Sequence, residues 1–250
     1  MYIIIFFVIV FLLFFIRKPV TEDTVWAYWN TIEKPEIVKR CIQNWKDVGG
    51  CKDVRVLNQY TIYRWIPLGV IAHFNTITKF EANKAVLIRF YLLKHYGGIW
   101  MDCSMFVTRH LDWLPRGKVF CFRAERFDCF DTFFVKAPKG SKFISDWLDQ
   151  CIIEYSDENF LDNNKQICKN NNFGSNCNYL RASVASKKID STGVVWESSE
   201  KGPFAHSLKA KWNPEEACKM ISYDQKIIKL YSSERHKCSL DIVFSNIERS

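Results

Sequence analysis

The 250-residue sequence predicts one α/β domain, with a mainly parallel sheet flanked by helices, behind an N-terminal transmembrane helix. Three observations predict it: an early strand–helix–strand order, a central helix that runs through a glycine pair into a buried strand, and an uncharged apolar run at the N-terminus. The length suits one sizeable core and is too short for two. We therefore assign residues 1–18 to an anchor and residues 19–250 to the domain.

The anchor is predicted from residues 1–16, which contain no charged side chain and are followed at once by Arg17 and Lys18. At about 1.5 Å per residue, such a helix is just long enough to span a thin bilayer. The basic segment and the small residues of a cleaved signal peptide are missing, so we expect an uncleaved single-pass anchor. The positive-inside rule favours a cytoplasmic domain, but many anchored sugar-transferring enzymes face a lumen, so the side of the membrane stays open.

The first half of the domain begins with a predicted βαβ unit. Val25–Trp29 is rich in β-branched and aromatic residues and predicts a strand, and the apolar spacing in Pro35–Trp45 predicts a helix. Asp53–Leu57 alternates as a second strand would. This order over about thirty residues is typical of a parallel sheet. Residues 60–80 are mixed in character and are interpreted as a connection.

The central stretch, Glu81–Val107, is predicted to be a helix, a glycine break and a short strand. Apolar residues recur every three or four positions up to Tyr96, and Gly97 and Gly98 then stop the helix. The apolar run that follows predicts a buried strand with Asp102 at its carboxyl end. Open α/β sheets place ligand-binding groups at that end of their strands.

The second half of the domain is predicted from shorter signals. A helical stripe begins at Ser141, and the Asn-rich residues 156–178 are interpreted as a long loop or irregular lobe. Three further strands are expected, at Val119–Arg123, Phe133–Lys136 and Ile227–Leu230.

The net charge and the cysteine content exclude few classes of function. The net charge of +8 suits an anionic sugar nucleotide or an anionic membrane surface, and it equally suits a simple solvated surface. No nucleic-acid-binding signature accompanies the scattered basic residues, so no nucleic-acid partner is expected. The ten cysteines show no CxxC pair, which argues against structural zinc and leaves free thiols or disulfides open.

The motif in the central stretch resembles a known family. The residues that match are Ala82, Arg89, Gly97, Gly98, Ile99, Trp100, Asp102 and Ser104. They resemble the pattern A-x-x-S-D-x-x-R, helix, G-G-(I/V)-(W/Y)-x-D-x-(S/D) of capsular polysaccharide synthesis type glycosyltransferases, related to glycosyltransferase family 32. The sequence departs from this pattern at Ala85-Val86, where the family has Ser-Asp.

This resemblance implies a GT-A fold of the Rossmann-related kind, a nucleotide-sugar donor and a divalent metal, Mn²⁺ or Mg²⁺. Such an ion would neutralise the charge that develops on the leaving diphosphate. Asp102 would bind the metal, and Ser104 would contribute a hydroxyl to the metal or to the donor. Arg89 would pair with the donor phosphate or sugar, and Gly98 belongs to the same donor-binding motif.

Other candidate residues come from outside that motif. Trp26 or Tyr28 could stack on the nucleobase, or could simply be core residues of a strand. Among the acids that follow the Val119–Arg123 strand, Asp131 is the candidate catalytic carboxylate, with a solvated loop acid as the alternative. His206 is a candidate third metal ligand, or alternatively a structural histidine.

These observations predict a membrane-anchored, metal-dependent glycosyltransferase that acts on a glycan or lipid-linked acceptor with retention of configuration. The alternative is a catalytically silent relative that binds nucleotide sugar, glycan or a partner enzyme at the membrane. The departure at Val86 keeps this alternative open.

Overall fold

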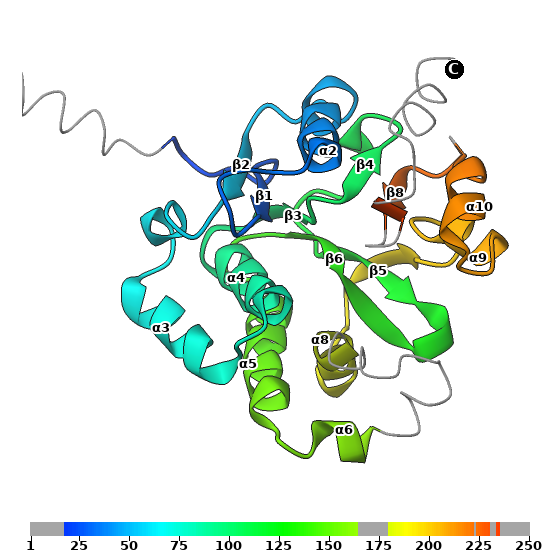
Figure 1. Ribbon diagram of the computed structural model, residues 1–250. Coiled ribbons are helices and arrows are strands. Elements are labelled where there is room, and N and C mark those ends of the chain that lie inside the picture. The colour runs from blue at the N-terminus through cyan, green and yellow to red at the C-terminus, as the bar shows by residue number, and fades with distance from the viewer. Residues whose placement is uncertain (1–17, 165–179, 223, 231–233, 236–250) are drawn as a thin grey trace, which may run out of the picture.

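The computed structural model describes residues 18–164, 180–222, 224–230 and 234–235 (Figure 1). The predicted anchor, residues 1–16, lies outside the described residues. Among the helices that are described, none is long and apolar enough to cross a membrane. The described residues form a mixed α/β structure around a six-stranded sheet with the order β2-β1-β3-β6-β5-β7.

The described strands are β1 (Val25–Tyr28), β2 (Val54–Leu57), β3 (Gly98–Met101), β4 (Met105–Val107), β5 (Phe120–Ala124), β6 (Cys129–Ala137), β7 (Val195–Ser198) and β8 (Ile227–Lys229). The described helices are α2 (Glu36–Asp47), α3 (Leu68–Ile77), α4 (Glu81–Tyr96), α5 (Lys142–Ser156), α6 (Phe160–Asn163), α8 (Arg181–Ala185), α9 (Ala205–Lys209) and α10 (Pro214–Lys219). The predicted strands and long helices are all present, with ends shifted by a few residues.

The prediction of a mainly parallel sheet is confirmed, with one reversed strand. β1 pairs in parallel with β2 and β3, and β5 pairs in parallel with β7. β6 runs antiparallel to both of its neighbours, β3 and β5. The short connection between β5 and β6 explains this reversal, because a parallel pairing would need a crossover of a dozen or more residues.

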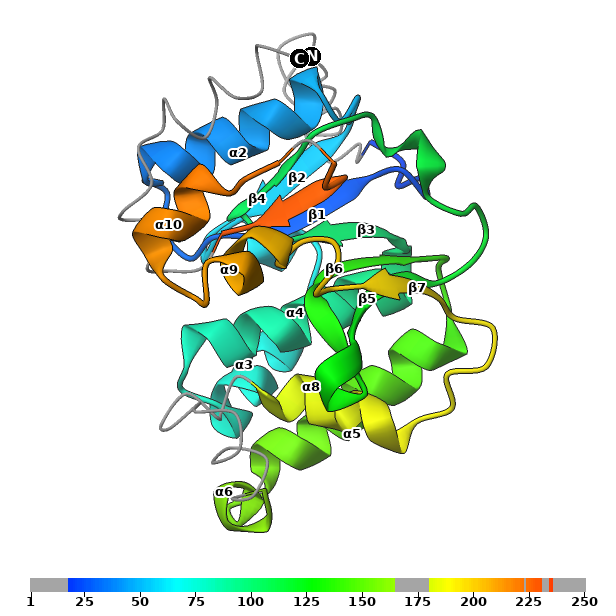
Figure 2. The same cartoon turned by 90° about the vertical axis from the view of Figure 1, so that its right-hand side faces the viewer.

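The sheet separates two layers, as both ribbon views show (Figures 1 and 2). α3, α4, α5 and α8 cover one face, and α2, α9, α10 and the small β4–β8 sheet cover the other. The alternation of side chains along the strands matches these layers. Val25 and Ala27 pack in the cluster on the α2 side, whereas Trp26 packs in the cluster on the α4 side.

The glycine pair after α4 is required by close packing and by backbone conformation. Gly97 and Gly98 have φ angles of +71° and +104°, in the region that favours glycine. A Cβ on Gly98 would lie 2.5 Å from the carbonyl oxygen of Thr24, and one on Gly97 would lie 2.6 Å from the amide nitrogen of Lys139. These contacts let β3 enter the sheet directly from the helix.

Two elements differ from the prediction. Residues 60–80 include a ten-residue helix, α3, that begins after Pro67. The apolar periodicity of α3 is weak, because only Ile71 and Phe74 are buried while Leu68 is exposed. The apolar run after Asp102 forms a second strand, β4, which pairs with β8 outside the main sheet.

The cysteines that the structure describes are mostly reduced. Six are free thiols, at positions 41, 51, 103, 121, 129 and 151, and Cys218 is disulfide-bonded. The other three cysteines lie outside the described residues.

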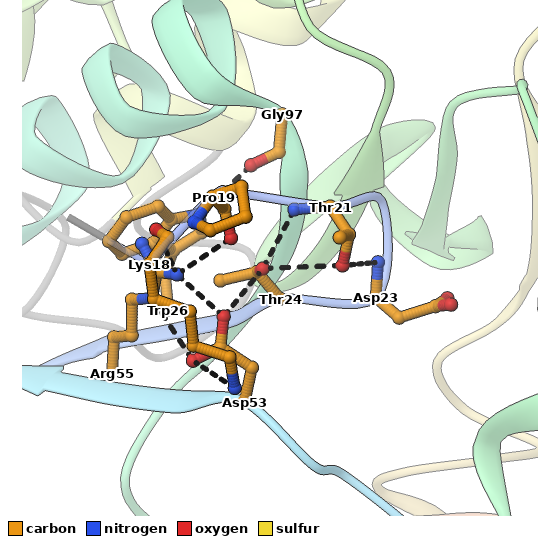
Figure 3. A network of polar contacts seen from close by, with 9 residues as sticks. All are labelled: Lys18, Pro19, Thr21, Asp23, Thr24, Trp26, Asp53, Arg55 and Gly97. Atoms are coloured by element: carbon orange, nitrogen blue, oxygen red, sulfur yellow. Dashed lines mark hydrogen bonds and ion pairs between the residues drawn. The ribbon is translucent and has the colours of Figure 1, made fainter. Parts of the chain in front are cut away.

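A polar network fixes the start of the described chain to the amino-terminal edge of the sheet (Figure 3). Arg55 Nη2 donates to the carbonyl oxygens of Lys18 and Pro19, at 2.9 and 3.0 Å. The same guanidinium pairs with Asp53, which also accepts from the Thr24 hydroxyl. Residues 18–24 are therefore held at the end of β1 opposite to that of Asp102.

Candidate active site

Asp102 lies at the carboxyl end of β3, as the sequence predicts, and joins the two layers of the molecule. Its backbone N–H donates to Phe133 of β6, and its side chain remains 26% exposed. One carboxylate oxygen faces the α4 layer, where Trp100 Nε1 donates to Oδ1 at 2.9 Å. The other oxygen faces the small sheet. This single carboxylate therefore receives contacts from both sides of the main sheet.

Arg89 of α4 is the partner of Asp102 in the helical layer. Its Nη2 donates to Asp102 Oδ1 at 2.7 Å, and its guanidinium carbon lies 4.8 Å from the centre of the Trp100 ring. The Arg89 side chain is only 4% exposed. Burial lowers the pKa of the guanidinium, and the charge of Asp102 opposes that effect. Arg89 thus contributes a buried positive charge and orients Asp102.

Lys229 of β8 is the partner of Asp102 on the opposite side. Its Nζ donates to Asp102 Oδ2 at 2.7 Å and to Ser104 Oγ at 2.8 Å. The register of the small sheet creates these contacts, because Lys229 pairs with Met105, one residue beyond Ser104. Burial alone would raise the pKa of Asp102, but Lys229 and Arg89 together hold it below its usual value.

Asp131 of β6 lies at the same edge of the sheet. β6 runs antiparallel to β3 with Phe134 opposite Met101, so residue 131 lies past the end of β3, two positions beyond Phe133, which accepts from the Asp102 N–H. The Asp131 carboxylate accepts a hydrogen bond from the hydroxyl of Ser199, the residue after β7. The pKa of Asp131 is raised to about 7, chiefly by burial; Glu200 adds to this rise, and Ser199 and Lys229 oppose it.

The two carboxyl groups therefore have opposite properties. Asp102 is held in the ionised form by two cations, whereas Asp131 titrates near neutral pH. A carboxylate with a pKa near the working pH is suited to accept and release a proton. Asp102 is suited to electrostatic organisation of the site.

The residues around Asp102 do not fit a resident divalent metal in the arrangement described. Both carboxylate oxygens already accept from N–H donors, and Lys229 lies where an ion between Asp102 and Ser104 would lie. Within the described ranges, no group of three or more His, Cys, Asp or Glu side chains is arranged to hold a metal. The metal expected from the motif stays a prediction.

His206, the predicted third metal ligand, lies in a separate buried cluster. Its Nε2 is 3.1 Å from Ser207 Oγ and 3.5 Å from Glu234 Oε2, and its Nδ1 is 3.4 Å from Gln225 Nε2. Its side chain is fully buried. These contacts explain His206 as a structural residue.

The predicted donor-binding residues of β1 and β3 occupy different positions. Trp26 is completely buried, donates to the carbonyl oxygen of Gly97 at 2.9 Å and packs edge-on against Trp65, so its ring is not accessible to a nucleobase. Gly98 lies at the opposite end of β3 from Asp102 and serves packing. Tyr28 is half-buried at the carboxyl end of β1, where its hydroxyl donates to Asn30 at 2.8 Å.

Lys229 is the residue that sequence reasoning missed. The terminal strand was predicted, and the signal was present within it: Lys229 is the single charge in the apolar run IIKL. A lysine in a buried strand needs a buried partner. The identity of that partner could not be deduced, since Lys229 and Asp102 are separated by 127 residues.

Comparisons with known proteins gave the following results. The model of the family described as "Capsular polysaccharide synthesis protein" matches residues 15–166. A search of curated proteins found no match. Among solved structures, "PaToxG Glycosyltransferase" aligns with 92% of this chain and 86% of its own, at 14% identity and a TM-score of 0.44. The family match includes Arg89, Asp102, Ser104 and Asp131, and it ends before Ser199 and Lys229.

Proposed function

Since the chain belongs to the family of capsular polysaccharide synthesis proteins, we propose that it is a glycosyltransferase that moves a sugar from a nucleotide-sugar donor to a glycan or lipid-linked acceptor. One observation carries the proposal. Arg89, Asp102 and Ser104, which are 15 residues apart in the sequence at most, meet at the carboxyl edge of the sheet with Lys229. That edge is where α/β sheets bind nucleotides.

Sugar transfer needs positive charge for the leaving group and a base for the acceptor, and this edge of the sheet has residues suited to both. The leaving nucleoside diphosphate requires positive charge, which Arg89 and Lys229 supply around Asp102. The acceptor hydroxyl requires a base, and Asp131, with a pKa of about 7, supplies one. We assign Asp131 as the general base, Asp102 as the residue that organises the cations, and Arg89 as the positioning residue for Asp102.

Retention of anomeric configuration is part of the proposal. The positive charge of Lys229 lowers the pKa of Asp131, and both residues belong to the candidate site at the carboxyl edge of the sheet. An acceptor that loses its proton to Asp131 would therefore approach from the side on which the diphosphate leaves. Attack from that side retains the configuration, and the anomeric coupling in the proton NMR spectrum of the product tests this point.

The proposal also includes a GT-A type fold and a membrane anchor. The mostly parallel sheet, with the candidate site at its carboxyl edge, is consistent with that fold. The uncharged run of residues 1–16 supports the anchor. Arg55 binds the backbone of Lys18 and Pro19, so such an anchor would emerge at the edge of the sheet opposite to Asp102.

The test uses the full-length protein in detergent with a panel of nucleotide sugars and measures released nucleotide. We expect turnover with at least one donor and a loss of about 10²-fold or more in Asp102→Asn. The substitution removes the charge that compensates Arg89 and Lys229, which costs about 3–5 kcal/mol of stability when a buried partner is lost. Thermal unfolding of the variant must therefore be recorded beside its activity.

The matched control is Asp47→Asn on α2, which changes an exposed aspartate whose partner is Gln43. This variant should keep full activity. Absence of turnover with every donor would reject the proposal that the chain is an active glycosyltransferase. Nucleotide-sugar binding without turnover would favour the catalytically silent relative. Val86 is relevant to that second outcome, because it lies in the core on the α4 side and supplies no carboxylate to the donor.

A further inference from the structure

Two buried cations bind the single carboxylate of Asp102, and a further carboxyl group at this edge, Asp131, is only partly ionised at neutral pH because its pKa is about 7. Arg89 and Lys229 both bind Asp102, and the charge of Arg235 acts on Lys229 as well. The side chains of Arg89 and Lys229 are 4% and 14% exposed, so water screens them poorly. Such a cluster attracts an anion and repels a further cation.

Lys229 occupies the position where the motif would place a metal. Its ammonium bridges Asp102 Oδ2 and Ser104 Oγ, the two motif positions that the sequence assigned to metal binding. An ammonium has three N–H groups, and these two contacts use two of them. The β4–β8 pairing fixes the lysine backbone beside Ser104, since Leu230 donates to the carbonyl oxygen of Ser104 at 3.0 Å.

We propose that the Lys229 ammonium replaces a divalent metal in this protein and binds the diphosphate of the donor directly. The inference deepens the proposed function and rests on it. The third N–H group of Lys229 donates to a non-bridging phosphate oxygen, while Asp102 and Ser104 hold the ammonium in place. Sugar transfer by this chain is therefore independent of divalent ions.

In the transfer step, protein side chains stabilise the leaving group and accept the proton, and no metal takes part. The bond between the anomeric carbon and the diphosphate oxygen breaks, and its electron pair stays on that oxygen, where the Lys229 charge stabilises it. The acceptor oxygen forms the new bond to the anomeric carbon. Its proton passes to Asp131, which releases it to solvent after the products leave.

The first arm of the test measures binding of nucleoside diphosphates to the full-length protein by calorimetry. UDP, GDP, ADP and CDP are compared in EDTA and in Mn²⁺. We expect at least one to bind equally well in both conditions. Lys229→Met should weaken that binding about tenfold or more, and Lys229→Arg should retain most of it. Lys226→Met, in the residue just before β8, is the matched control and should bind like the wild type, because Lys226 pairs with Glu197.

The second arm uses Mn²⁺ alone and follows the electron paramagnetic resonance signal of the free ion. The wild type should leave that signal unchanged. Mn²⁺ binding that disappears in Asp102→Asn would overturn the inference. Lys229→Met leaves Asp102 paired one-to-one with Arg89, so it should fold, and its thermal unfolding verifies this.

The outcomes separate the two proposals. Diphosphate binding that requires Mn²⁺, or that is unchanged in Lys229→Met, overturns the role of Lys229 and leaves the glycosyltransferase standing. Metal-free binding that depends on Lys229, without sugar transfer from any donor, supports the role of Lys229 in diphosphate binding. It also rejects the proposal that the chain is a glycosyltransferase. If no diphosphate binds in either condition, both proposals fail.

Discussion

At the scale of single residues, two aspartates at one edge of the sheet have different roles because their neighbours differ. Asp102 accepts from two cations and an indole N–H, which outweigh the effect of burial on its pKa. Asp131 accepts from a neutral hydroxyl and lies near Glu200, so burial dominates and raises its pKa to about 7. Sequence position cannot reveal this difference, because it depends on which charges the fold brings close.

The first prediction concerns the pH dependence of sugar transfer. If Asp131 is the base, kcat/KM falls as the pH drops below about 7, because the protonated carboxyl cannot accept a proton. Asp131→Asn should remove this pH dependence and lower kcat by about 10²–10⁴-fold with little change in KM. Steady-state rates between pH 5 and pH 9 check both. The control is Asp128→Asn, an exposed residue at a φ of +53° that asparagine tolerates.

A second prediction follows from the same carboxyl group. Its pKa is raised on folding from 3.8 to about 7, so the native protein binds the proton more tightly than the unfolded chain. Folding stability is therefore lost as the pH rises from about 4 to 7 and stays lower above that range. Asp131→Asn removes the destabilising effect of the buried, ionised carboxylate. It should therefore raise the melting temperature at pH 8, with no gain at pH 4. A gain that is the same at both pH values would contradict the assignment.

At the scale of elements, the turn from α4 into β3 positions the site. α4 carries Arg89, the glycine pair reverses the chain direction, and β3 ends at Asp102. The Arg89–Asp102 contact spans only 13 residues, so local geometry is enough to form it. The glycines are thus needed for the site although they lie at the far end of the strand.

The third prediction tests that requirement. Gly98→Ala would place a Cβ 2.5 Å from the Thr24 carbonyl oxygen at a φ of +104°, so we expect a loss of about 2–4 kcal/mol in the free energy of unfolding. Gly69→Ala is the matched control, because Gly69 lies in α3 with no atom within 4 Å of the added Cβ. It should stabilise by about 0.5 kcal/mol. Equal effects in urea unfolding would show that the close approach to Thr24 does not matter.

At the scale of the whole molecule, the two edges of the sheet have separate tasks. The carboxyl edge carries Asp102, Asp131 and Lys229, and the amino edge binds the start of the described chain through Arg55 (Figure 3). Arg55 also packs over Trp26 and Trp65, at 5.1 and 4.6 Å from the ring centres. Substitutions at one edge should therefore leave the other edge intact.

The fourth prediction uses this separation. Arg55→Ala should speed hydrogen exchange in residues 18–24 and cost about 1–2 kcal/mol, because four charge-assisted hydrogen bonds and ring packing are lost. Nucleoside diphosphate binding should not change, since the site lies at the opposite edge. Exchange mass spectrometry and calorimetry measure the two effects. Lys39→Ala, an exposed residue of α2, is the control for both. Weakened nucleotide binding in Arg55→Ala would mean that the two edges are coupled.

The sequence by itself determined the βαβ unit, the long helices, the glycine break and the positions of Arg89, Asp102 and Ser104. These features depend on periodicity, turn chemistry and contacts within about twenty residues, which are readable along the chain. Only the tertiary structure decided that Lys229 binds Asp102, that Trp26 is a core residue and that His206 belongs to another cluster. Those outcomes depend on β8 pairing with β4 across more than 100 residues, and on the burial that follows.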